Sequence, residues 1–295
     1  MPPERTAQTY GPGITAASRS VLLELMTVLG HYREAVVLVG GWVPYFLLTQ
    51  HRRADHAMMH VGSIDIDLAM DPAGVKESEY MTVMELLAER GYRPALNRRG
   101  GTIPCSVERA VPSPLTQKPY TIRIDFLAPQ TDSGPRQAQT APVQDDLLAR
   151  KVKGCEAAFA HSTTVQLSGV LPGGGEMTVP VRMADVVGIL TMKGIVLGER
   201  YREKDPYHIY MLIKHYPRNL GELAARFRPH LTEPLVNEAL AGIHTAFGRR
   251  EANGPAWVAA FLTNPVFAAE RERLVTDAFM VVNEFTTLLC ESSLK

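Results

Sequence analysis

Hydrophobic and polar residues alternate along two short segments in the first half of the chain. Residues 62–68 read GSIDIDL and residues 121–127 read TIRIDFL. Because side chains of a β-strand point alternately to opposite faces, each pattern predicts a strand with one apolar and one polar face. Asp65 and Asp67 then project from the same face, with Cα atoms about 6.5 Å apart at a rise of about 3.3 Å per residue. Both carboxylates can reach one metal ion or bridge two.

An earlier apolar run ends at a glycine pair. Residues 35–39 read AVVLV, which is typical of a buried strand, and Gly40 and Gly41 follow directly. Residues 42–48 read WVPYFLL and predict a short helix with Pro44 in its first turn, where a missing N–H is tolerated. Free amides at the start of a helix favour an anion. A plain tight turn explains the glycine pair equally well, so both interpretations stay open.

The rest of the pattern predicts an α+β protein. A mixed β-sheet flanked by helices is expected in a domain over residues 1–145, and a mainly helical domain over 146–295 with a β-hairpin near 163–181. The further elements predicted are helices at 16–29 and 77–90, a strand at 103–108, a loop or linker at 129–142, a helical piece at 147–160, a hairpin from 163–167 and 177–181, and helices at 184–197, 207–214, 235–247 and 267–289.

Asp125 is a third acidic residue on a predicted strand. If its strand lies beside that of Asp65 and Asp67, three carboxylates converge, and Asp125 is either a general base or a further metal ligand. The alternative is a surface aspartate paired with Arg123 on the same face. Oxygen ligands of this kind suit Mg²⁺ or Mn²⁺. Two such ions about 3.5–4 Å apart stabilise the attacking and leaving oxygens of an in-line phosphoryl displacement.

The order of a glycine pair, an Asp-x-Asp and a later single aspartate resembles the nucleotidyltransferase fold shared with DNA polymerase β. Residues 189–197, ILTMKGIVL, and 202–208, REKDPYH, narrow the resemblance. They are similar to the last two motifs of the AbiEii-type nucleotidyltransferase toxins of bacterial toxin–antitoxin and abortive-infection systems. There a lysine-bearing helix precedes an Arg-x-Lys-Asp-x-x-Asp signature. The resemblance spans residues 30 to 290 or so, and implies a nucleotidyltransferase-type sheet.

The resemblance implies a role for each matching position. Phosphates would be held at the glycine pair, Lys193 would contact the triphosphate, and Asp205 would be a candidate base. The implied catalytic residues are Asp65, Asp67, Asp125, Lys193 and Asp205, the first three also being metal ligands, and the implied substrate contacts are Gly40, Gly41, Ser63, Arg202, Lys204 and His208. His208 replaces the final aspartate of the signature. It is no carboxylate ligand but still forms hydrogen bonds, which leaves open a weakened or altered activity.

Lys193 and Asp205 also have simpler interpretations. Residues 183–200 carry apolar positions at helical spacing, so Lys193 emerges from an otherwise buried helix and either extends its tip to solvent or serves a ligand. Asp205 before Pro206 is a signal for a helix N-cap. Capping and catalysis are compatible roles.

Composition and charge fit a cytoplasmic enzyme. The chain has 295 residues, 45% of them hydrophobic, which suffices for two domains with cores. No run of eighteen apolar residues and no apolar leader is found, so a membrane location is not predicted. Cys105, Cys155 and Cys290 are odd in number and widely spaced, which favours a reducing compartment, and the nine histidines show no metal-ligand spacing. The formal net charge of +0 argues against binding nucleic acid mainly through phosphates, although local basic clusters exist.

The expected function is transfer of a nucleoside monophosphate from an NTP to an acceptor hydroxyl. The resemblance implies the 3′ end of tRNA as acceptor, a growth-arresting toxin as the biological role, and a separately encoded antitoxin as partner. Two other classes stay open: modification of a protein or of a small molecule such as an aminoglycoside, and non-catalytic nucleotide binding in view of His208. The preferred NTP, the RNA, the antitoxin and the oligomeric state are not predicted.

Overall fold

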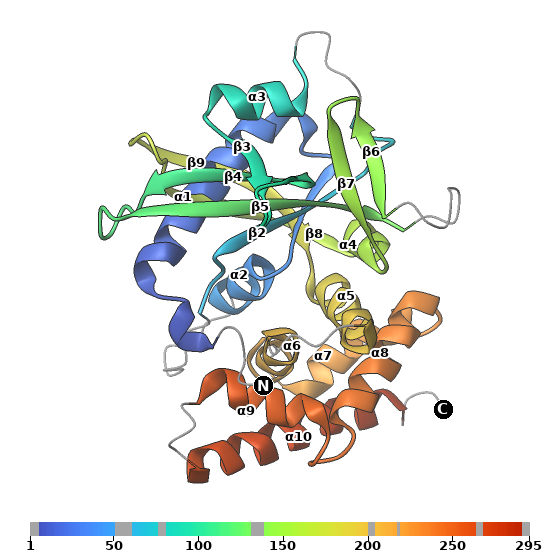
Figure 1. Cartoon of the computed structure of the whole chain (residues 1–295). Helices are drawn as coiled ribbons and strands as arrows, with labels where there is room; N and C mark the ends of the chain where they lie inside the picture. Colours follow the sequence, from blue (N-terminus) through green and yellow to red (C-terminus); the bar gives the residue numbers. More distant parts are fainter. Residues whose placement is uncertain are drawn as a thin grey trace. The chain divides into compact units, whose positions relative to one another are not determined.

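The structure is a computed structural model that describes residues 6–50, 61–75, 81–130, 139–199, 204–216, 219–263 and 268–290. The chain forms two compact units (Figure 1). The sheet unit consists of Tyr10–Val43 and Gly62–Asp185, and the helical unit consists of Met1–Thr9, Pro44–Val61 and Val186–Lys295. The expected α+β class, a mixed sheet with helices and a mainly helical C-terminal part, is confirmed.

A mixed sheet of nine strands forms the sheet unit, counted over the described residues. Its order is β3-β4-β5-β2-β1-β9-β8, and β7 pairs with both β5 and β6. The strands are β1 Val36–Val39, β2 Asp65–Met70, β3 Arg93–Leu96, β4 Thr102–Pro112, β5 Pro119–Pro129, β6 Thr140–Gln144, β7 Leu147–Val152, β8 Ser162–Val170 and β9 Glu176–Ala184. At its centre, β2 runs antiparallel to β1 and parallel to β5.

In the described part of the sheet unit, three helices accompany the sheet: α1 Pro12–Val28, continued by the 3₁₀ turn η2 Leu29–Tyr32, α3 Val83–Glu89 and α4 Cys155–Ala160. Helix α1 packs on β2, β4, β5, β8 and β9. Its Glu24 accepts a hydrogen bond of 3.3 Å from Arg109 Nε on β4. Arg109 pairs with Ile122 of β5, so α1 covers the face to which Ile122, Ile124 and Phe126 point. All three of these side chains are fully buried.

Helix α1 with η2, Pro12–Tyr32, is long and apolar enough to cross a membrane by length and composition alone. Signal sequences and the core helices of globular proteins share these properties. Here Val21, Leu22 and Leu25 are fully buried within the unit. We therefore interpret α1 as the core helix of the sheet unit.

The helical unit is built from α-helices around an aromatic core. Its helices are α2 Trp42–Gln50, whose first two residues belong to the sheet unit, α5 Val186–Glu199, α6 Lys204–His215, α7 Leu220–Phe227, α8 Pro234–Phe247, α9 Asn253–Leu262 and α10 Ala268–Cys290, with 3₁₀ turns at Ala7–Thr9 and Arg228–His230. Tyr207 and Phe261 stack with ring centroids 4.4 Å apart. Helices α5 and α8 meet at glycines: a Cβ on Gly194 would lie 2.5 Å from the Ala239 carbonyl oxygen.

Several sequence predictions need correction. Residues 147–152 were predicted as helix but form β7, because Arg150 pairs with Leu127 of β5 and a helix begins only after Gly154, at φ +83°. The predicted loop at 129–142 contains the start of β6, and residues 131–138 lie outside the described part. Helices α7 and α9 were not predicted. The hairpin near 163–181 pairs through β9 with β1, and it belongs to the sheet unit, whose last residue is Asp185.

Candidate active site

The polar face of β2 carries Asp65 and Asp67. Their side chains are partly exposed, while the alternating Ile66 and Leu68 are fully buried on the opposite face. The prediction that both carboxylates share one face is therefore confirmed by the strand pattern. Further along the same face, Ala69 is fully buried, so the polar stretch is confined to the first half of β2.

Asp125 lies on the neighbouring strand, directly beside Asp67. Strands β2 and β5 run parallel with Asp65 opposite Arg123 and Asp67 opposite Asp125. Residues in register on adjacent strands point to the same face, and the strands are about 4.7–4.9 Å apart. The three acidic residues thus share one face of the sheet, which is the face opposite α1. This proximity was expected from the sequence only on the condition that the two strands are neighbours.

Asp125 accepts hydrogen bonds from two side chains, Arg123 and Ser106, and nothing in the sequence indicates that these two lie together. Arg123 Nε donates to Asp125 Oδ1 at 2.8 Å, and Ser106 Oγ of β4 donates a short hydrogen bond to the same oxygen. Arg123 Nη2 also donates to Ser106 Oγ at 3.1 Å. The alternative interpretation of Asp125, an aspartate paired with Arg123, is therefore present in the structure together with its place beside Asp67. Only the pairing of β4 with β5 reveals Ser106, and residue alternation carries no such signal.

The glycine pair forms the turn between β1 and α2. Val39, the last residue of β1, is paired with Asp67, and Gly40 adopts φ +71°. A Cβ on Gly40 would lie 2.0 Å from Asp67 Oδ2. The turn thus passes directly over this carboxylate, and only glycine combines the positive φ with so close an approach.

Two contacts fix the surroundings of the turn within the sheet unit. Trp42 Nε1, at the start of α2, donates to Ser18 Oγ of α1 at 3.1 Å. Ser63, expected as a small polar site residue, is 3% exposed just before β2. Next to it, Gly62 adopts φ +73° against the Thr15 side chain. The turn is therefore anchored to α1 by a hydrogen bond, and the segment before the acidic strand passes close to Thr15 of α1.

The predicted residues of the C-terminal motifs belong to the helical unit. Lys193 Nζ on α5 donates to Asp205 Oδ1 on α6 at 2.8 Å, and the two residues are 6% and 9% exposed. Asp205 lies inside the first turn of α6 rather than at its N-cap, because the helix begins at Lys204. There its charge complements the helix dipole. His208, on the same helix, is 1% exposed. Arg202 lies outside the described residues.

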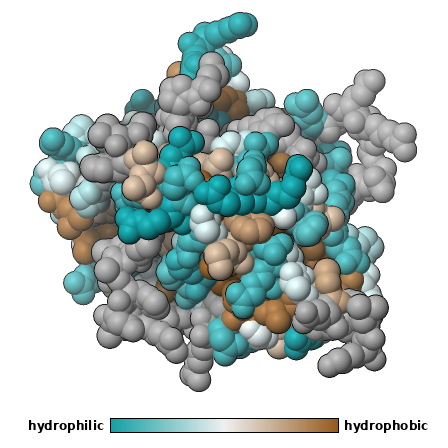
Figure 2. Space-filling model, turned by 90° about the horizontal axis from the view of Figure 1, so that it is seen from below, coloured by the Kyte–Doolittle hydropathy of each residue, from teal (hydrophilic) through white to brown (hydrophobic). Residues whose placement is uncertain are grey.

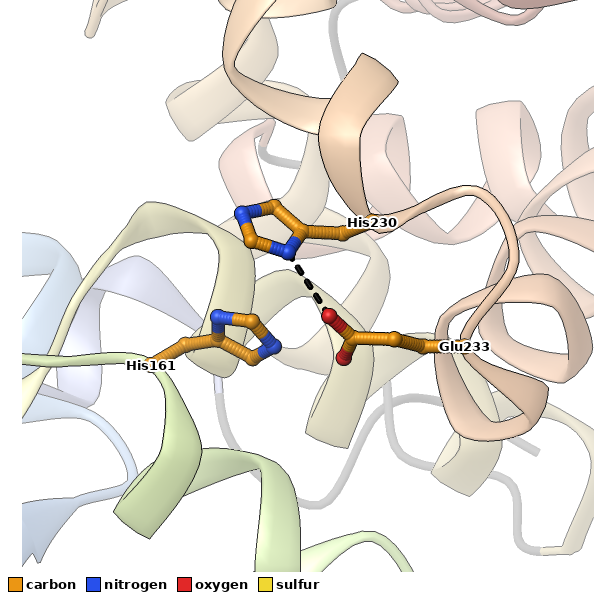
Figure 3. Close-up of side chains that lie close together, drawn as sticks. All are labelled: His161, His230 and Glu233. Carbon is orange, nitrogen blue, oxygen red and sulfur yellow. Dashed lines mark hydrogen bonds and ion pairs between the residues drawn. The ribbon is translucent and has the colours of Figure 1, made fainter.

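A histidine and a glutamate of the helical unit form a close pair. His230 Nδ1 lies 2.7 Å from Glu233 Oε1, three residues further along the chain (Figure 3). The pair has the i,i+3 spacing of neighbours on one helical turn, so it is explained as a local hydrogen bond. His161, also drawn in Figure 3, belongs to the sheet unit.

The helical unit also has a hollow on its surface. Figure 2 shows hydrophilic and hydrophobic residues intermixed on the face seen from below. A shallow pocket of about 370 Å³ is lined by Arg250, Glu272, Arg273, Thr276, Asp277 and Met280. Arg250 Nε donates to Thr276 Oγ1 at 3.1 Å, and Lys214 of α6 pairs with Asp277. The predicted site residues that the structure describes do not line this pocket.

Comparison with known proteins gives distant structural likenesses. No protein-family model and no curated protein matches the chain. Among solved structures, JHP933 from Helicobacter pylori matches with a TM-score of 0.39 and 14% identity, over 94% of this chain and 95% of that one. A structure described as a "putative nucleotidyltransferase from H. pylori" matches with a TM-score of 0.38 and 13% identity, over 93% and 97%. Likenesses this distant carry no functional argument.

Proposed function

We propose that the chain is a metal-dependent nucleotidyltransferase, which moves a nucleoside monophosphate from an NTP to an acceptor hydroxyl and releases pyrophosphate. The observation that carries the proposal is the face shared by Asp65, Asp67 and Asp125 beside the turn at Gly40. Carboxylates next to a glycine turn at a helix start suit a metal-bound triphosphate.

The donor set fits Mg²⁺ or Mn²⁺. Asp65, Asp67 and Asp125 offer hard carboxylate oxygens, which these ions prefer. Among the described residues none donates a hydrogen bond to Asp125 Oδ2, and Gly40 has no Cβ that would crowd Asp67 further. When bound, the ion supplies electrostatic stabilisation of the attacking and leaving oxygens.

The remaining roles fall to groups of the chain itself. Backbone amides at Gly40 and Gly41 would orient the phosphates, and Asp125 or Asp205 would accept the proton of the acceptor hydroxyl. Lys193 would offset the charge that develops on pyrophosphate. The roles of Lys193 and Asp205 rest on the sequence resemblance, and in the structure these two residues are paired with each other.

The proposed acceptor is the 3′ end of tRNA, and the proposed biological role is that of a toxin restrained by a cognate antitoxin. Both proposals rest on the resemblance of the Lys193 helix and of residues 202–208 to the AbiEii-type motifs. With a formal net charge of +0, the chain would recognise RNA through local contacts rather than a general basic surface.

The decisive experiment is a screen with labelled NTPs. Purified protein is incubated with each α-labelled NTP, Mg²⁺ or Mn²⁺, and one of four acceptor samples: total lysate, RNase-treated lysate, pure tRNA or an aminoglycoside. We expect label in RNA with lysate and tRNA, and none after RNase treatment. Label in protein or in the aminoglycoside would assign the transfer to those acceptors. Nucleotide binding without pyrophosphate release would show that the chain is a nucleotide-binding protein and not an enzyme.

A pair of variants links the transfer to the acidic face. In Asp65→Asn/Asp67→Asn, transfer should fall to background, because two carboxylates lose their charge without a change in size. The matched control is Asp71→Asn, since Asp71 follows the same strand but accepts a hydrogen bond from Ala73 N in the next turn. Undiminished transfer by the double variant would refute the assignment.

A further inference from the structure

Ser106 is a buried polar residue for which the proposed mechanism has no role. It is 3% exposed, in the middle of β4, and its register partner is Asp125 of β5. On the same strand Val107 points to the opposite, apolar face, where it is 2% exposed. A hydroxyl at such a position is costly to bury without a partner. The hydrogen-bond partners of Ser106 therefore indicate its role.

The hydroxyl belongs to a closed network of three side chains. Arg123 donates from Nε to Asp125 Oδ1 at 2.8 Å and from Nη2 to Ser106 Oγ at 3.1 Å, and Ser106 donates to the same Asp125 Oδ1. Because Ser106 Oγ accepts from Arg123, its own hydrogen is directed to the carboxylate. Two donors from two adjacent strands thus fix one oxygen of Asp125.

The second carboxylate oxygen of Asp125, Oδ2, is not engaged by this network. Within the described part of the chain, Asp125 Oδ2 receives no hydrogen bond. The Asp125 side chain is 18% exposed and lies in register with Asp67. A carboxylate held at one oxygen presents the other in a defined direction, which is how a reactive group is kept in productive geometry.

We infer that Ser106 is a positioning residue, which together with Arg123 holds Asp125 Oδ1 so that Oδ2 alone faces the reactants. This inference rests on the proposed function. It applies whether Oδ2 accepts the proton of the acceptor hydroxyl or binds the metal ion. The two cases differ in what the loss of the Ser106 hydroxyl changes, since a proton acceptor affects kcat and a metal ligand also affects metal affinity.

The test compares Ser106→Ala, Ser106→Thr and the matched control Ser20→Ala. Ser20 is also 3% exposed, and its hydroxyl donates to the Val170 carbonyl oxygen at 2.7 Å from α1, on the other face of the sheet. In Ser106→Ala we expect kcat to fall about 3- to 10-fold, the value of one hydrogen bond, while KM for the NTP stays within about twofold. Ser106→Thr should restore kcat, and Ser20→Ala should keep it.

Two parallel measurements separate the outcomes. Mn²⁺ titration by electron paramagnetic resonance measures metal affinity without turnover: weaker binding in Ser106→Ala identifies Oδ2 as a ligand, and unchanged binding with lower kcat identifies it as the proton acceptor. Unchanged kcat and Mn²⁺ affinity in Ser106→Ala, with transfer lost in Asp65→Asn/Asp67→Asn, would overturn the positioning role alone. Full transfer in both variants would overturn the proposed function. An equal loss of kcat in Ser20→Ala would make the effect of Ser106 merely structural.

Discussion

The approach of Gly40 to Asp67 gives the sharpest prediction, because one added methyl group should disturb both the fold and the site. In Gly40→Ala, the residue keeps φ +71° only at a backbone cost of about 1–2 kcal/mol. The new Cβ would lie 2.0 Å from Asp67 Oδ2 and 2.7 Å from Asp67 Cγ. The carboxylate must therefore move by about 1.4 Å to regain an ordinary contact distance.

The two effects have separate magnitudes. The backbone cost alone should lower the melting temperature by about 2–4 °C per kcal/mol in a unit of this size. A misplacement of about 1 Å at a catalytic group costs on the order of 100-fold in rate. We therefore expect Gly40→Ala to lose about 100-fold in nucleotidyl transfer and to bind Mn²⁺ more weakly, while the protein remains folded.

Gly175→Ala is the matched control for Gly40→Ala. Gly175 has φ +84°, and nothing lies within 4 Å of a Cβ built there. Its alanine variant pays the same kind of backbone cost without a collision, so the difference between the two variants isolates the displacement of Asp67. Thermal unfolding, Mn²⁺ titration and the labelled-NTP assay are run on both. If Gly40→Ala matched Gly175→Ala in all three, Asp67 would not be held against the glycine turn.

Two further predictions concern a buried ion pair of the helical unit and a buried thiol of the sheet unit. Asp205→Ala should lower the free energy of unfolding, measured in urea, by about 3–5 kcal/mol, because it leaves Lys193 buried without its 2.8 Å partner. The double variant Lys193→Met/Asp205→Leu should recover most of the lost stability. If Asp205→Ala were as stable as the parent, the pair would not be important for stability. Burial raises the pKa of the Cys155 thiol from 9.0 to about 12, so the unfolded state releases this proton first and stability falls as the pH rises from about 9 towards 12. In Cys155→Ala the dependence of the unfolding free energy on pH in this window should be shallower by one proton, and an unchanged slope would show that the thiol does not contribute.

The strands of the site could be predicted from the sequence, because hydrophobic and polar residues alternate in them with a period of two. In β2, the face of Ile66 and Leu68 must be the buried one, because the other face carries Asp65 and Asp67. The register that places Asp67 beside Asp125 could not be predicted in the same way. It depends on which strands become neighbours, and β2 and β5 are separated in sequence by two other strands. Alternation within a strand contains no information on that choice.

The errors have a common physical origin in short, weakly patterned segments. Residues 147–152 read LLARKV, whose composition suits a helix, yet pairing with β5 and β6 satisfies the backbone better than a helix before Gly154 would. Likewise the hairpin at 163–181 was assigned to the second domain by its place in the sequence. Its strand β9 instead extends the sheet next to β1, with Leu38 opposite Met183. In both cases a tertiary contact decides what local propensity leaves open.

The two interpretations of Asp125 become one when the network is considered as a whole. A surface ion pair with Arg123 would be worth little, and at 39% exposure the Arg123 side chain is well solvated. Ser106 changes this, because a buried hydroxyl that bonds both partners ties the pair to β4 and restricts the carboxylate. The same contacts that give Asp125 a structural role leave Oδ2 as its one uncommitted oxygen. In the positioning role that we propose, pairing with Arg123 is therefore no alternative to a role in the site, but the means by which that oxygen would be directed.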